Sequence, residues 1–114
     1  MTELQTNITK DLKSIEEQMG NPTFTWQNNT YPIVASVASF DRQLESGGFA
    51  VDLLLTGTVR INNLNGSKQV TTIPQPQQKL VYNVDGRTYR INTVHQDPTQ
   101  SYFRIIARGT FKGI

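Results

Sequence analysis

The stretch FAVDLLLTGTVRI, residues 49–61, decides the fold. Its odd-numbered positions are apolar apart from Gly57, and polar residues such as Asp52 and Arg60 fall between them. This period of two is typical of a β-strand with one buried face. At roughly 3.3 Å per residue the stretch spans about 43 Å, which is long for one strand, so we expect a bend near Gly57. The function therefore rests on a β scaffold.

Residues 2–19 predict one amphipathic α-helix before the β region. Thr2 and Gln5 fit a capping box, Gly20 suits a left-handed C-terminal cap, and Pro22 prevents continuation. Five apolar residues fall within an arc of about 80° when each residue advances about 100°: Leu4, Ile8, Leu12, Ile15 and Met19. We expect this stripe to pack on the sheet, and docking on a neighbouring subunit is the alternative.

The rest of the chain reads as short strands joined by turns. Residues 24–26 and 31–40 form a hairpin, and 41–48 form a loop into the long strand. Asp85 and Gly86 separate two alternating runs and predict a type I′ turn. A further turn at 96–100 precedes the last strand, 102–108, and a tail, 109–114. We expect a single domain over 1–114 that is mainly β with one N-terminal α-helix, built as a small antiparallel β barrel or sandwich over 23–108.

Residues 62–78 form the longest polar stretch between expected strands. Connections longer than about 12–15 residues are usually functional or disordered. We expect a projecting arm here, with Lys68 and Gln69 as candidate contact residues; a hairpin loop with a frayed tip is the alternative.

Composition excludes several classes of function. The chain has no cysteine, which removes thiolate catalysis and fits a reducing cytoplasm. The N-terminus lacks a signal-peptide pattern and no stretch approaches the ~20 apolar residues of a membrane span, so we expect a soluble protein with no membrane partner. A formal charge of +2 is too mild to select nucleic acid as a partner.

No pattern of catalytic residues is convincing. The single histidine, His95, lies in an expected turn beside Asp97 and Ser101, where such residues commonly bond to the backbone. One histidine and scattered acids make no metal-ligand set, and no phosphate-binding glycine motif occurs. We therefore expect no enzyme, no cofactor and no metal.

Two sets of residues are candidates for contacts. Four arginines lie on the outward positions of their strands, with Tyr102 among them: Arg60, Arg90, Arg104 and Arg108. A basic face with aromatic residues is how oligonucleotide-binding barrels hold single strands, although outward arginines also keep sheets soluble and block edge pairing. Phe111 and Ile114 in the tail fold onto the chain's own core or reach a neighbour.

The order of these parts resembles the small head-tail joining proteins of tailed bacteriophages. The resemblance rests on Gly47-Gly48-Phe49, on the stretch DGRTYRI, residues 85–91, and on the closing DPTQSYFRIIARG, residues 97–109. It implies a neck, head-completion or stopper protein of the virion that forms a ring with itself in the host cytoplasm. Its partners would be the portal or adaptor protein, tail proteins and packaged DNA. The alternatives are a tail terminator or other tail component, and a single-stranded nucleic-acid-binding barrel.

Overall fold

The computed structural model describes residues 1–43 and 49–113, with side chains described for 1–40 and 51–110. One helix precedes the strands, so the predicted mainly β class with one N-terminal helix is confirmed. The elements, in chain order, are α1 (Glu3–Gln18), β1 (Thr23–Trp26), β2 (Asn29–Pro32), β3 (Val34–Gln43), β4 (Phe49–Arg60), β5 (Lys79–Tyr82), β6 (Arg87–Gln96) and β7 (Tyr102–Gly113).

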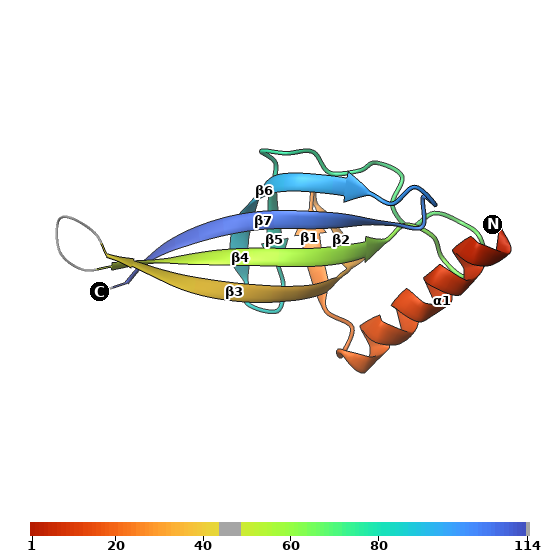
Figure 1. The fold of residues 1–114 in the computed structure, drawn as a ribbon, viewed down its shortest axis with the longest axis horizontal. Helices are drawn as coiled ribbons and strands as arrows, with labels where there is room; N and C mark the ends of the chain where they lie inside the picture. The colour runs from red at the N-terminus through yellow and green to blue at the C-terminus, as the bar shows by residue number, and fades with distance from the viewer. Residues whose placement is uncertain (44–48, 114) are drawn as a thin grey trace.

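All seven strands belong to one antiparallel sheet in the order β2-β1-β5-β6-β7-β4-β3. The sheet curls into a half-barrel, so that β1, β2 and β5 lie behind β4 and β7 in Figure 1. The large side chains on its concave side are buried, among them Phe24, Leu55, Tyr89 and Phe103. Two edges remain open, at β2 and at β3.

Both ends of α1 carry the caps that the sequence predicts. The Thr2 hydroxyl accepts a hydrogen bond from the Gln5 backbone N–H at 3.1 Å, and the Thr2 N–H donates to Gln5 Oε1 at 3.0 Å. After the helix, Gly20 has a φ of 82°, in the left-handed region that glycine occupies without strain. The predicted capping box and the left-handed Gly20 are therefore confirmed.

Gly57 lies inside the long strand because of close packing against Ile33. Its backbone pairs with Ala35 on one side and Ile105 on the other, so the ladder is continuous through this position. A Cβ added there would lie 2.5 Å from Ile33 Cδ1. Glycine is therefore needed for the approach of a neighbouring side chain, and no break in pairing marks the bend that we expected there.

The turn between β5 and β6 differs from the predicted type I′ geometry. It comprises four residues, 83–86, and of these only Gly86 has a positive φ, 69°. The Gly86 N–H donates to the Tyr82 carbonyl at 2.8 Å, and Asp85 Oδ1 accepts from the Arg87 N–H at 2.9 Å. The Asp85 side chain thus closes a wider turn, and the two-residue prediction is wrong.

The C-terminal strand is longer than predicted, because residues 109–113 continue β7 and pair with the start of β4. Strand β6 pairs with β7 only as far as Arg108. Beyond that point three strand ends continue together: Ser39–Gln43 of β3, Phe49–Leu53 of β4 and Gly109–Gly113 of β7. We call these strand ends the arm. Figure 1 shows the arm extending away from the helix end of a molecule that measures 56 × 27 × 24 Å.

Candidate functional site

An ion pair between Arg60 and Glu16 joins the end of β4 to α1. Arg60 Nε donates to Glu16 Oε2 at 3.1 Å and Nη2 donates to Oε1 at 3.3 Å. Both side chains are only 5% exposed. The guanidinium also donates to the Asn62 carbonyl and to the side-chain oxygens of Asn63 and Gln69. A buried charge pair needs bidentate contact and additional hydrogen-bond acceptors to offset the loss of water around the two charges.

This geometry corrects the prediction for Arg60. Its position in the strand points to the outer side of the sheet, as expected, but α1 and the loop after β4 cover that side. Within a folded chain, Arg60 therefore cannot meet DNA in a channel or contact a neighbouring subunit. Its described contacts hold the helix and the loop on the sheet.

The 62–78 segment packs along the body, which corrects the predicted projecting arm. Val70 and Pro74 are buried, and the Gln69 N–H donates to the Ile61 carbonyl at 2.9 Å. Gln69 Nε2 also donates to the Arg60 carbonyl at 2.6 Å, so this candidate contact residue has an internal role. Lys68 is exposed. The projecting feature of the molecule is the arm of β3, β4 and β7.

The helix lies on the sheet through a face that the apolar stripe does not predict. Its buried residues are Thr9 and Glu16, whose mean direction lies about 90° around the helix from the middle of the stripe. Three residues of the stripe remain exposed: Leu4 at 58%, Ile15 at 40% and Met19 at 47%. We call these three the helix apolar edge. The sequence left two alternatives for the stripe, packing on the sheet or docking on a neighbouring subunit. These three residues do not pack on the sheet, so they remain accessible for docking on a neighbour.

A second polar contact fixes the beginning of α1. Gln5 Nε2 donates to the Thr99 carbonyl in the β6–β7 turn at 2.7 Å. On another side of the helix a shallow hollow of about 320 Å³ is lined by Lys10, Lys13, Ser14, Glu17 and Leu64. Because the helix is attached near both ends, the helix apolar edge is a preformed surface.

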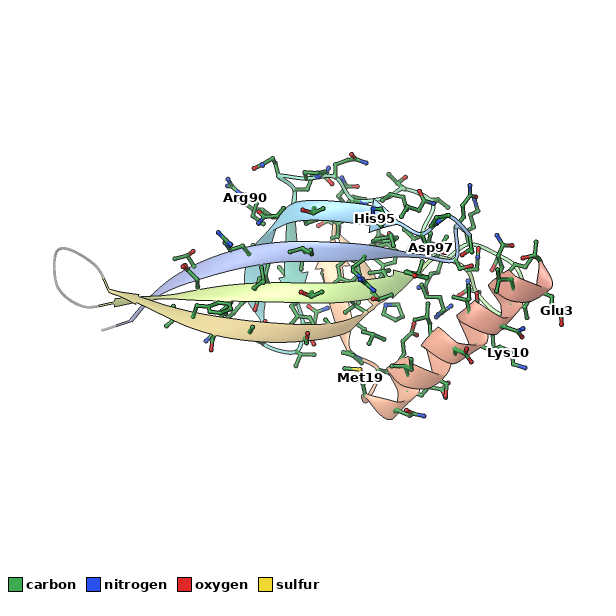
Figure 2. The ribbon with its side chains drawn as sticks, in the orientation of Figure 1. Glu3, Lys10, Met19, Arg90, His95 and Asp97 are labelled. Carbon is green, nitrogen blue, oxygen red and sulfur yellow. The ribbon has the colours of Figure 1, made fainter. Side chains whose placement is uncertain are left out.

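The three remaining candidate arginines are exposed on the convex side of the sheet. Arg90 lies opposite Arg108 across β6 and β7, and His95 lies opposite Arg104. Lys79 on β5 lies opposite Arg90, so one row across three strands carries three positive charges. Figure 2 shows Arg90 pointing away from the sheet and His95 nearer the helix end of β6. The sequence alone does not place Lys79 in this row, because it does not reveal the strand register across β5 and β6.

The candidate tail residues stay untested. The side chain of Phe111 and the whole of Ile114 lie outside the described residues, although the backbone of Phe111 pairs with Val51.

The residues around His95 are arranged as a turn. Asp97 accepts hydrogen bonds from the Thr99 hydroxyl and from its N–H, at 3.0 Å for the latter. These two bonds hold the pKa of Asp97 below its usual range, and the bond from the hydroxyl has the largest effect. Ser101 is fully buried, and its hydroxyl is hydrogen-bonded to the Thr99 hydroxyl at 3.0 Å. Among the described residues no hydrogen bond joins His95 to Asp97 or Ser101.

Among the described side chains, those of residues 1–40 and 51–110, no three of His, Asp or Glu gather closely enough to hold a metal ion. The same part of the chain contains no helix with the length and apolar character needed to cross a membrane. Comparison with known proteins finds no matching family model and no curated protein of significant sequence similarity.

Proposed function

We propose that this chain is a structural protein of the tailed-bacteriophage neck, which assembles as a ring and joins the portal to the tail. The observation that carries the proposal is the presence of two separate docking features, the helix apolar edge at one end and the arm at the other (Figure 1). The resemblance to head-tail joining proteins in the order of parts supports the same assignment.

Strand β3 presents an open edge suited to pairing, most of it beside the body of the molecule and its last residues in the arm. β3 is a terminal strand of the sheet and runs for ten residues. Its first seven residues, VASVASF at 34–40, contain neither charge nor proline, and they lead into the arm, where Asp41 and Arg42 follow. Proteins usually protect long edges of this kind with lysine, proline or a bulge. An edge that carries none of these over seven residues fits a strand that a partner covers in the assembled particle.

The helix apolar edge supplies a different kind of surface. Leu4, Ile15 and Met19 are held on a helix whose caps and polar attachments are already formed in the single chain. A partner that binds there pays little to order it. Because this surface and the arm differ, contact between copies would be heterologous, and heterologous contacts that close by rotation give rings.

Electron microscopy of a phage or prophage with an early stop codon in this gene tests the neck assignment. We expect free tails beside unjoined heads, including heads that have lost DNA. Complete tailed particles would contradict the proposal. Joined particles whose tails have abnormal lengths would instead identify a tail terminator.

Complementation of that phage tests the helix apolar edge. The variant Ile15→Gln/Met19→Gln should fold but restore joining poorly, because it makes the exposed apolar surface polar. The matched control Asp11→Asn/Glu17→Gln changes two exposed residues of the same helix and should restore joining fully. Equal rescue by both variants would remove the helix apolar edge from the assembly.

A further inference from the structure

The convex side of the sheet carries a row of basic residues across three strands. Lys79, Arg90 and Arg108 are directly opposite one another across β5, β6 and β7. Arg104 and His95 form a second opposed pair nearer the helix. Within the described side chains no hydrogen bond or salt bridge joins Lys79, Arg90, Arg104 or Arg108 to an acid. We call Lys79, Arg90 and Arg108 the basic row.

This arrangement costs stability in the isolated chain. Adjacent strands are about 4.8 Å apart, and like charges directly opposite one another on antiparallel strands are destabilising. The same chain neutralises Arg60 fully with Glu16. The acid on the convex side of β4, Asp52, accepts a hydrogen bond from Thr110 at 2.9 Å in the arm. An external anion would therefore relieve repulsion that the described part of the fold leaves in place.

The surroundings of the basic row favour phosphate over an acidic protein surface. Stable protein interfaces have cores rich in aromatic and apolar residues and poor in lysine. Around the row, the same side carries Thr88 and Thr93, which are exposed, and Val81 and Ile106, which are half-buried. Arginine, lysine and threonine are typical donors to phosphate and sugar oxygens.

Exposed aromatic rings are few on the convex side, which favours a duplex over a single strand: among the described side chains Phe40 on β3 is 56% exposed, but it lies two strands away from β7. Single-strand binding sites stack bases on exposed aromatic rings. Among the described side chains on the convex side of β5, β6 and β7, the aromatic residue is Tyr102, which is half-buried and opposite Arg60 at the helix end. We propose that the basic row, with Arg104, binds the sugar-phosphate backbone of double-stranded DNA.

The resemblance behind the neck assignment implies packaged DNA as a partner, and this inference assigns a surface to that partner; the two proposals fail separately. DNA binding is measured on the isolated full chain, whereas joining is measured on particles. A chain that joins heads to tails and binds no duplex would overturn only the inference made here.

Fluorescence anisotropy with a labelled duplex of about 20 base pairs provides the test. Contact with three or four phosphates predicts that affinity falls roughly 40- to 150-fold between 50 and 200 mM salt. The variant Lys79→Gln/Arg90→Gln/Arg108→Gln should bind at least about tenfold more weakly at 50 mM salt and lose most of the salt dependence. Arg90→Lys/Arg108→Lys retains the charges and should retain the salt dependence.

The matched control is Lys10→Gln/Lys13→Gln/Lys68→Gln, which removes the same charge from the helix and the 62–78 segment. This variant isolates the effect of net charge, which attracts DNA without a defined site. We expect it to bind duplex within about twofold of the original chain. Equal losses in the two triple variants would overturn the basic row as the binding site. Absence of binding at 50 mM salt, or tighter binding of a single strand of equal length, would overturn the proposal as well.

Discussion

Glu16 and Arg60 depend on each other, since removal of either leaves the other charged and buried. Glu16→Ala should lower the free energy of unfolding by about 3–5 kcal/mol. Urea denaturation followed by circular dichroism measures this change. Glu17→Gln alters the adjacent exposed carboxylate and should change the same free energy by less than about 0.5 kcal/mol. A loss below about 1 kcal/mol for Glu16→Ala would mean that water hydrates these two charges in solution, so that they are not a buried pair.

Tyr89 predicts how stability depends on alkaline pH. Burial, followed by the hydrogen bond that its hydroxyl donates to Asp85 Oδ2 at 2.5 Å, raises the pKa of Tyr89 far above its ordinary value near 10. The folded state therefore keeps this proton after the unfolded state has released it, so the stabilisation is complete below about pH 10 and falls as the pH rises above that value.

The variant Tyr89→Phe should be less stable at neutral pH but show a flatter decline above about pH 10. Urea unfolding between pH 8 and pH 11 measures both slopes. Parallel curves for the two proteins would show that other groups cause the alkaline loss.

The sequence alone predicts which side of its strand Arg60 occupies and does not predict its burial. Alternation along 49–61 assigns Arg60 to the outer side correctly. What covers that side depends on how α1 docks, and the strongest helical signal, the apolar stripe, points about 90° away from the buried residues. A lone glutamate within a charged helix gives no sequence signal that it will pair with a strand 44 positions later.

At the scale of elements, the 62–78 segment should respond to mutation like the core at Val70 and like the surface at Leu64. Val70→Ala removes buried methyl groups and should cost about 2 kcal/mol of unfolding free energy. Leu64→Ala, in the same segment, alters a side chain that is 45% exposed and should cost less than about 0.5 kcal/mol. Thermal or urea unfolding gives both values. If both variants lose equally little unfolding free energy, the segment does not pack on the body and the predicted projecting arm would be correct.

The helix and its caps, which depend on local signals, were predictable from the sequence, whereas features that depend on distant pairing were not. Capping residues and the glycine after α1 act within a few residues, so the helix was predicted almost to its ends. The continuation of β7 through residue 113 depends on β4 as a partner, because Gly109 and Gly113 look like chain breakers when read alone. The packing of the 62–78 segment depends likewise on Arg60, Ile61 and Ile91.

At the scale of the whole molecule, each chain contains its own core. The buried cluster draws on every strand except β2, whose half-buried Tyr31 packs against it, and it closes inside one half-barrel. We therefore expect the urea midpoint to stay constant over about a hundredfold range of protein concentration, since only folding coupled to association depends on concentration. A midpoint that rises with concentration would mean that contacts between chains complete the fold.

The class of fold was predictable and its connectivity was not. Periods of two and of 3.6 residues distinguish strands from helix, so a mainly β chain with one helix was predicted. Sheet order places β1 beside β5 and β4 beside β7, and such non-local pairings leave no trace in periodicity. The basic row, which exists only through that order, could therefore not be predicted by counting charges.

The ion pair beneath α1 also bears on how this protein would respond to selection. Apolar replacement of a buried ion pair is often neutral or stabilising, by up to about 4 kcal/mol. Glu16→Leu/Arg60→Met is thus a change that a laboratory screen for heat resistance would favour. With the polar attachment gone, the helix is free to turn its own leucines and isoleucines inward, and the helix apolar edge would then be lost. If that edge is the docking surface proposed above, the most heat-resistant descendants would assemble least well, a conflict between stability and function that natural proteins commonly show.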